Sequence, residues 1–137
     1  MSLVLDASIT LAWTYAGENT DAVLRVFEIV KSEGASVPAL WRWEIANALE
    51  MNAKRGRHGR DFSYEALAAF ALFPILVDAE CVENAWLDTL SLAERHGLTV
   101  YDAAYLELAI RRKIPLATLD RELRAAAESE GLQLLGG

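Results

Sequence analysis

Four acidic residues lie where the chain leaves an apolar run or enters a helical pattern. Asp6 and Asp120 follow short apolar runs, and Glu44 and Asp102 lie near the starts of predicted helices. In a parallel sheet, ligands bind at the carboxyl ends of the strands, close to the point where the strand order reverses. We therefore expect the four carboxylates to converge in one pocket.

Converging carboxylates repel one another and need a partner. Two like charges ~4 Å apart cost on the order of 4 kcal/mol at an effective dielectric constant near 20. No Lys or Arg lies within three residues of Asp6. A hard divalent cation would offset the repulsion, and oxygen-rich carboxylate sites select Mg²⁺ or Mn²⁺. Such ions support phosphodiester hydrolysis.

Each acid also has a purely structural interpretation. Asp6 and Asp120 stand at N-cap positions, where Asp is preferred. Thr99 and Asp102 have the spacing of a capping box. Glu44 lies in an apolar stretch of tryptophans and aliphatic residues, where an unpaired buried carboxylate costs several kcal/mol. This acid therefore needs a partner.

No other motif suggests a competing chemistry. His58, in a basic loop, and His96, before a glycine that ends a helix, both fit structural roles. The single cysteine, Cys81, excludes an intramolecular disulfide and fits a small buried residue. The chain has neither a Walker loop nor a GxGxxG motif.

Short apolar runs alternate with helical patterns along the whole chain. This order predicts an α/β, three-layer domain with a central parallel sheet of about five strands flanked by helices, occupying residues 1–137 as a single domain. The strands are expected at 3–5, 35–38, 75–77, 116–118 and 132–135. The helices are expected at about 6–16, 21–33, 40–57, 63–72, 80–96, 102–112 and 120–129.

Composition places the chain among folded globular proteins. Of its 137 residues, 53% are hydrophobic and 24% are charged. The longest apolar run, 66–77, contains Pro74 and is shorter than the roughly 20 residues of a membrane span. The N-terminal residues lack the basic lead of a signal peptide. We expect a cytoplasmic protein without a membrane partner.

The net charge of −7 is unevenly distributed. Segments 42–60 and 111–124 each hold five basic residues against two acidic ones. Two interpretations remain open: solvated helix faces, or local surfaces that bind a polyanion.

Four motifs occur in order over essentially the whole chain. They are Leu5-Asp6-Ala7-Ser8, Glu44-Ile45-Ala46-Asn47-Ala48-Leu49, Gly97-Leu98-Thr99-Val100-Tyr101-Asp102-Ala103-Ala104-Tyr105-Leu106 and Leu116-Ala117-Thr118-Leu119-Asp120. Together they resemble the PIN domain, and most closely the VapC toxins of type II toxin–antitoxin pairs. The resemblance implies a Mg²⁺- or Mn²⁺-dependent endoribonuclease that cleaves RNA, is inhibited by a cognate antitoxin protein and forms a homodimer.

The resemblance also implies roles for individual residues. Asp6 and Asp102 resemble the principal metal ligands, Glu44 the third acid and Asp120 the fourth. The hydroxyls beside the site would be those of Ser8 and Thr118. The chain departs from the family near Trp13, where many relatives carry a lysine, and this puts substrate choice in doubt.

Other classes agree less well with the motifs. A phosphoacceptor receiver domain needs an acidic pair after its first strand, and a haloacid-type phosphatase needs an Asp where this chain has Ser8. A PIN-fold nuclease outside a toxin–antitoxin pair and a non-catalytic PIN-fold binding module remain as alternatives.

Overall fold

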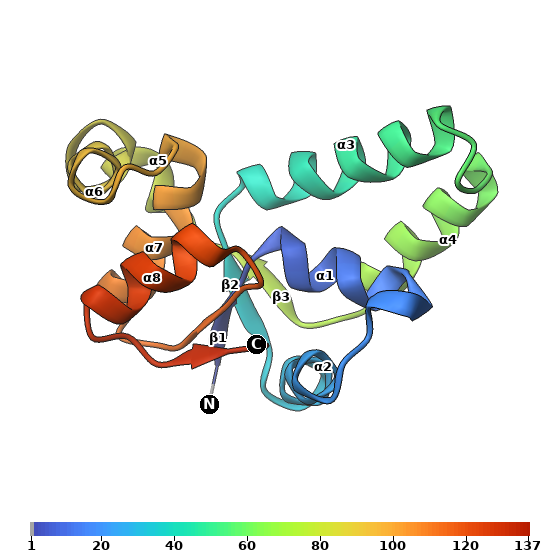
Figure 1. Cartoon of the computed structure of the whole chain (residues 1–137), viewed down its shortest axis with the longest axis horizontal. Helices are drawn as coiled ribbons and strands as arrows, with labels where there is room; N and C mark the ends of the chain where they lie inside the picture. Colours follow the sequence, from blue (N-terminus) through green and yellow to red (C-terminus); the bar gives the residue numbers. More distant parts are fainter. Residues whose placement is uncertain (1) are drawn as a thin grey trace.

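Five parallel strands form the centre of the molecule in the computed structural model, which describes residues 2–137 (Figure 1). Their order across the sheet is β3-β2-β1-β4-β5. Each strand pairs in parallel with its neighbours. The strands are β1 (Leu3–Leu5), β2 (Ala35–Val37), β3 (Ile75–Val77), β4 (Leu116–Ala117) and β5 (Leu134–Leu135).

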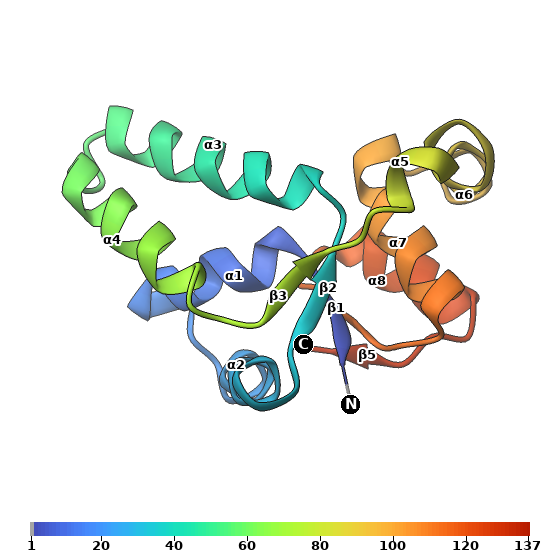
Figure 2. The same cartoon turned by 180° about the vertical axis from the view of Figure 1, so that it is seen from behind.

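Helices cover both faces of this sheet. Right-handed crossovers place the helices that follow β1 and β2 on one face, and those that follow β3 and β4 on the other (Figures 1 and 2). The first group is α1 (Ala7–Thr14), the 3-10 helix η1 (Ala16–Glu18), α2 (Asp21–Glu33), α3 (Leu40–Lys54) and α4 (Arg60–Phe70). The second is α5 (Cys81–Asn84), the π-helix η2 (Ala85–Thr89), α6 (Leu90–His96), α7 (Val100–Arg112) and α8 (Arg121–Ser129).

The predicted α/β architecture with a five-stranded parallel sheet is confirmed. The continuous helix predicted at 80–96 is wrong in one respect, because a π-helical turn interrupts it. Cys81 before this turn, Thr89 at its end and Leu92 after it are buried, whereas Trp86 within the turn is 89% exposed. The predicted buried state of Cys81 is confirmed.

The order of the strands places a reversal of winding at the carboxyl edge of the sheet, the position where ligands bind in folds of this kind and which we call the crevice. After β1 the chain crosses toward β2 and β3, whereas after β4 it turns toward β5, so the direction of winding reverses between β1 and β4. Both strands are fully buried. Residues that follow them are therefore held at the reversal point by a rigid core.

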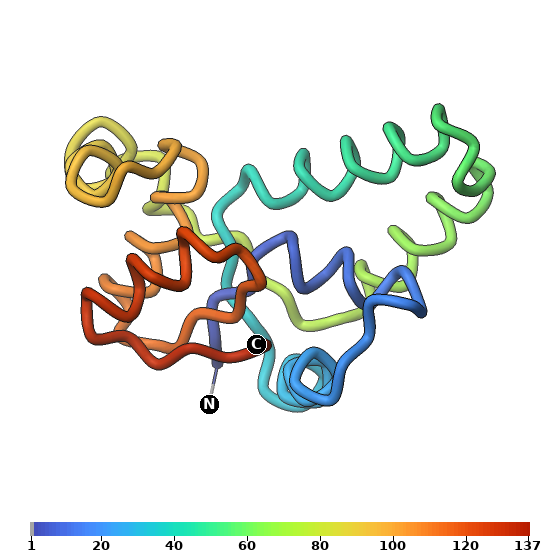
Figure 3. The backbone as a smooth tube through the Cα atoms, in the orientation of Figure 1, coloured from blue at the N-terminus to red at the C-terminus, as the bar shows by residue number. Residues whose placement is uncertain are grey.

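Two further features frame this crevice. Helices α3 and α4 pack together as a hairpin that extends away from the sheet (Figure 3). Opposite them, α7 packs on β1 and β4 through a helix face that is completely buried at several positions. Within residues 2–137, no helix combines the length and the apolar character that a membrane crossing requires.

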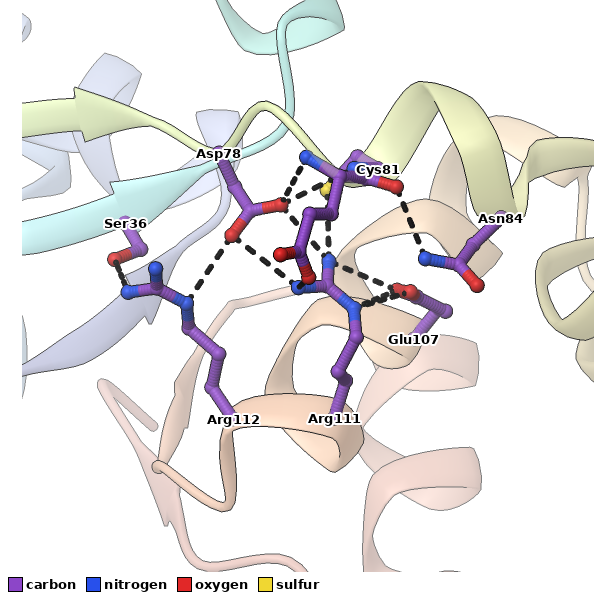
Figure 4. A network of polar contacts seen from close by, with 8 residues as sticks. Ser36, Asp78, Cys81, Asn84, Glu107, Arg111 and Arg112 are labelled. Atoms are coloured by element: carbon purple, nitrogen blue, oxygen red, sulfur yellow. Dashed lines mark hydrogen bonds and ion pairs between the residues drawn. The ribbon is translucent and has the colours of Figure 1, made fainter.

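A buried ion network fastens α7 to the edge of the sheet (Figure 4). The Asp78 carboxylate accepts hydrogen bonds from Arg111 Nη2 at 2.9 Å and from the backbone N–H of Glu80 at 2.9 Å, and pairs with Arg112 Nε at 3.1 Å. Arg111 Nε also donates to Glu107 Oε1 at 2.8 Å. Burial would raise the pKa of Asp78, but these donors outweigh it and the pKa is lowered.

Replacing Arg111 by Met should lower the free energy of unfolding at pH 7 by about 3 kcal/mol, because it leaves the buried Glu107 carboxylate unpaired and weakens the pairing of Asp78. Since the pKa of Asp78 is lowered in the folded state, the stabilisation is present above about pH 4 and is lost as pH falls through the folded pKa. Urea unfolding at pH 7 and pH 3 measures both effects.

The matched control is Arg60→Met. Arg60 also makes a 2.8 Å ion pair, with Glu50, but both side chains are exposed, at 59% and 43%. Exposed pairs contribute at most about 1 kcal/mol. Equal losses in the two variants would contradict a stabilising role for the buried network.

Candidate metal-binding active site

Asp6 lies at the centre of the crevice, in the single extended residue between β1 and α1. Its backbone N–H continues the pairing with β4 by donating to Ala117 O at 3.0 Å. The residue is only 6% exposed, although its side chain makes no capping hydrogen bond to α1. Capping therefore does not explain this buried acid.

Two hydroxyls hold the Asp6 carboxylate. Ser8 Oγ donates to Asp6 Oδ2 at 2.6 Å, and Thr118 Oγ1 donates to the same oxygen at 2.7 Å. Burial raises the pKa of Asp6, these hydrogen bonds partly offset that rise, and the charge of Asp120 adds to it. The chain thus keeps a carboxylate here with neutral donors alone.

Thr118 also forms a hydrogen bond with the backbone of a second acidic residue, Asp120. Its hydroxyl accepts a hydrogen bond from the backbone N–H of Asp120 at 3.1 Å, while Ser8 Oγ accepts one from the N–H of Leu119 at 2.9 Å. The two hydroxyls therefore fasten the end of β1 to the end of β4. The Asp120 carboxylate caps α8 by accepting from the N–H of Leu123 at 2.9 Å, so its predicted capping role is confirmed.

Asp102 lies in the first turn of α7, the helix that packs on β1 and β4. Thr99 caps this helix by accepting a hydrogen bond from the Asp102 N–H at 3.1 Å. Burial raises the pKa of Asp102, and the charges of Asp120 and Asp6 raise it further. Helix α7 thereby presents this carboxylate toward two other acids.

Glu44 reaches the same crevice from the first part of α3. It is half-buried, and its Oε1 accepts a 2.5 Å hydrogen bond from the hydroxyl of Tyr105. Burial raises the pKa of Glu44, the hydrogen bond from Tyr105 opposes the rise, and the charges of Asp6 and Asp102 add to it. The partner that the sequence analysis expected for Glu44 is therefore Tyr105, which lies on another helix.

The structure therefore gathers acids from four separate segments within electrostatic reach of one another. Over residues 2–137, no three His, Cys, Asp or Glu side chains already stand at metal-ligating geometry. The charges of Asp6, Asp102 and Asp120 nevertheless act on one another, and those of Asp6 and Asp102 act on Glu44. Their donor set, carboxylates and hydroxyls only, suits a hard divalent cation such as Mg²⁺ or Mn²⁺.

Tyr105 is the site residue that sequence reasoning missed. It stands within a predicted apolar helix, where a tyrosine looks like an ordinary core residue. The available signal was its spacing, because residues three apart on a helix share a face and Tyr105 follows Asp102 by three. Burial raises its pKa, as do the charges of Glu44 and Asp6, so the phenol stays a donor at neutral pH.

One of the two interpretations of the basic segment 111–124, a surface that binds a polyanion, does not fit two of its arginines, because they make ion pairs within the chain. Arg111 pairs with buried Asp78 and Glu107, and Arg112 pairs with Asp78 and donates to Ser36 Oγ at 3.2 Å. Both guanidinium groups therefore neutralise acids of the chain itself, although the Arg112 side chain remains 50% exposed.

Comparison with known proteins agrees with this geometry. The model of the PIN domain family matches residues 3–129. Ribonuclease VapC3 of Pyrobaculum aerophilum is 32% identical over 123 residues, covering 90% of this chain and 92% of the relative. The crystal structure of PAE2754 from the same organism has a TM-score of 0.66 at 26% identity, covering 92% of this chain and 84% of that one.

The fold also occurs in the crystal structure of VapBC2 from Rickettsia felis bound to a DNA fragment from their promoter. That similarity has a TM-score of 0.65 at 15% identity and covers 98% of this chain and 97% of that one. The predicted resemblance is confirmed. Since the family model covers nearly the whole chain and places all four acids within its match, the chain belongs to the PIN domain family.

Proposed function

We propose that this chain is a Mg²⁺- or Mn²⁺-dependent endoribonuclease and the toxin of a type II toxin–antitoxin pair. The observation that carries the proposal is the acidic crevice, in which Asp6, Glu44 and Asp102 each have a pKa raised by burial and by neighbouring acids. Such a cluster favours binding a divalent cation. Relatives named Ribonuclease VapC support RNA as the substrate.

Each acid has a distinct part in this proposal. Asp6 and Asp102 would hold the cation, with Glu44 as the third ligand and Asp120 as a fourth acid beside it. When bound, the ion activates water and neutralises charge on the phosphate oxygens. Glu44 or Asp120 would orient the attacking water or accept its proton. Ser8 and Thr118 keep Asp6 in place.

Two exposed arginines that lie close in sequence to the site acids would contact the RNA backbone. Arg121 directly follows Asp120, and Arg42 precedes Glu44 by two residues. Both are exposed, and neither has an ion pair or hydrogen bond in the described structure. Phosphate contacts of this kind make affinity fall as salt rises, and unstacked bases in single-stranded loops are the parts of RNA that side chains read most easily.

An antitoxin would find two complementary surfaces. An apolar groove of about 540 Å³ lies between α3, α4 and β3, with Trp43, Leu67 and Ile75 in its lining. The acidic crevice would accept arginines, which bind carboxylates through bidentate, charge-assisted hydrogen bonds. We propose that an apolar antitoxin segment packs on these helices while its basic residues enter the crevice.

A homodimer would cover the exposed apolar stripe on α5, η2 and α6. Val82, Trp86 and Leu90 follow one another at four-residue spacing and are 72%, 89% and 41% exposed. Leu76 on the edge strand β3 is 71% exposed. Isolated apolar residues need no partner, but a stripe of this kind on a helix is typical of an interface.

Trp86→Glu should weaken the dimer about thirtyfold or more, because a central aromatic residue of an interface typically contributes at least 2 kcal/mol. Sedimentation velocity over a concentration series measures the change. Tyr64→Glu is the control, since Tyr64 is 70% exposed on α4 away from the stripe. A wild type that sediments as a monomer throughout would contradict the homodimer.

Metal binding should change stability through the acids. At pH 7, in the absence of metal, Asp102→Asn should raise the melting temperature by about 2–5 °C, because the pKa of Asp102 is raised in the folded state and its charge opposes folding at this pH. The gain should vanish below about pH 4, where the acid is protonated in both states. Differential scanning calorimetry measures both values.

Adding Mn²⁺ should make the wild type more stable than Asp102→Asn, the reverse of their order without metal. At a concentration about 100-fold above its Kd, Mn²⁺ stabilises the wild type by about 2.7 kcal/mol through mass action, and Asp102→Asn should gain much less. Glu65→Gln, which removes an exposed acid on α4, should respond like the wild type. Identical responses of Asp102→Asn and Glu65→Gln would place the metal elsewhere.

The decisive assay is cleavage of total cellular RNA with Mn²⁺. Asp6→Asn should reduce the rate by at least the 10–100-fold typical of residues that support metal sites, while its amide oxygen still accepts from Ser8 or Thr118 and preserves the fold. Asp61→Asn, an exposed acid on α4, is the control. In this mechanism water attacks the phosphodiester in place of the ribose 2′-hydroxyl, so the products should carry 5′-phosphate and 3′-hydroxyl ends. Products with 2′,3′-cyclic phosphates would refute this mechanism.

A further inference from the structure

One hydrogen bond links the two sides of the acidic crevice. Tyr105 on α7 is 0% exposed, and its hydroxyl donates to Glu44 Oε1 on α3 at 2.5 Å across 61 residues of sequence. In the described part of the chain, no other hydrogen bond or ion pair joins α3 to α7. The two helices stand on opposite sides of the carboxyl edge of the sheet (Figures 1 and 2).

Without this bond, little would keep Glu44 in the crevice. The charges of Asp6 and Asp102 act against the ionised Glu44. Glutamate also has a long, flexible side chain, and at a half-buried position it can turn toward water. The rigid, buried ring of Tyr105 holds one end of the contact, so the phenol fixes the carboxylate in the orientation that repulsion opposes.

A neutral hydrogen-bond donor is suited to orienting the Glu44 carboxylate. An arginine or lysine in its place would bring a positive charge and occupy the position of a cation. The phenol satisfies Oε1 and leaves the negative charge of Glu44 in the crevice. Its other oxygen, Oε2, has no hydrogen bond in the described structure and is available to a ligand.

We propose that Tyr105 is a positioning residue, which holds Glu44 as a pre-oriented ligand for the divalent cation. The inference rests on the proposed metal-dependent nuclease function. Helix α7 thereby supplies one acid directly, as Asp102, and fixes a second acid through a side chain one turn later. A tyrosine that serves the apolar core alone would have no effect on metal affinity beyond its effect on folding.

Tyr105→Phe tests the proposal, because it removes the hydroxyl and keeps the buried ring. Isothermal titration of the full-length protein with Mn²⁺ should show a Kd about tenfold higher than that of the wild type, in the range typical for partners that orient metal ligands. Tyr101→Phe makes the same chemical change on the same helix, at a side chain that is 68% exposed and has no hydrogen bond in the described structure. It should bind Mn²⁺ as the wild type does.

A double-mutant cycle separates positioning from general packing. If Tyr105 acts through Glu44, then adding Tyr105→Phe to Glu44→Ala should leave the Mn²⁺ Kd unchanged. In RNA cleavage at saturating Mn²⁺, Tyr105→Phe should lower kcat and leave the KM for RNA unaltered. Thermal melts of all variants in the absence of metal report whether the fold is retained.

The outcomes distinguish this inference from the proposed function. If the wild type binds Mn²⁺ and cleaves RNA but Tyr105→Phe binds Mn²⁺ as tightly as Tyr101→Phe, the positioning role is overturned and the nuclease proposal stands. An equal loss of affinity in the Glu44→Ala background also overturns it, since the hydroxyl would then act on another group. If the wild type neither binds Mn²⁺ nor cleaves RNA, both proposals fail.

Discussion

Burial of the Asp6 carboxylate at the end of the central strand is the constraint on which the site depends. The sheet topology places this acid where β1 and β4 diverge, and the fully buried strands on either side prevent it from moving toward water. Two hydroxyls solvate it from within the protein. The crevice is therefore acidic because the fold holds its charge in place without neutralising it.

A comparison with Asp78 shows that a buried carboxylate held by neutral donors alone is specific to the crevice. Asp78 also has little exposed surface and follows a strand of the same sheet, but two arginines and two backbone N–H groups surround it and lower its pKa. Asp6 receives only neutral donors and its pKa is raised. The same fold thus stabilises one buried aspartate with cations and leaves the other in need of one.

The sequence was sufficient to predict the sheet, because its strands follow from local patterns, whereas the role of the four acids stays a prediction. Continuous apolar runs identified every strand bound to within two residues, and Asp6 and Asp120, which follow such runs, had to lie at one edge of a parallel sheet. Contacts between side chains distant in sequence were not predictable. The bond from Tyr105 to Glu44, the pairing of Arg111 with Asp78 and the π-helical turn at 85–89 all depend on how helices pack, which periodicity alone does not encode.

Thr118 also has a consequence for how the chain can change over evolution. One hydroxyl donates to Asp6 and accepts from the backbone of Asp120, so a substitution at this position disturbs two acids in a single mutational step. Only serine or threonine combines a donor and an acceptor on so short a side chain. Asp6 and Asp120 are therefore coupled through one side chain, and serine is the replacement at residue 118 that would keep both hydrogen bonds.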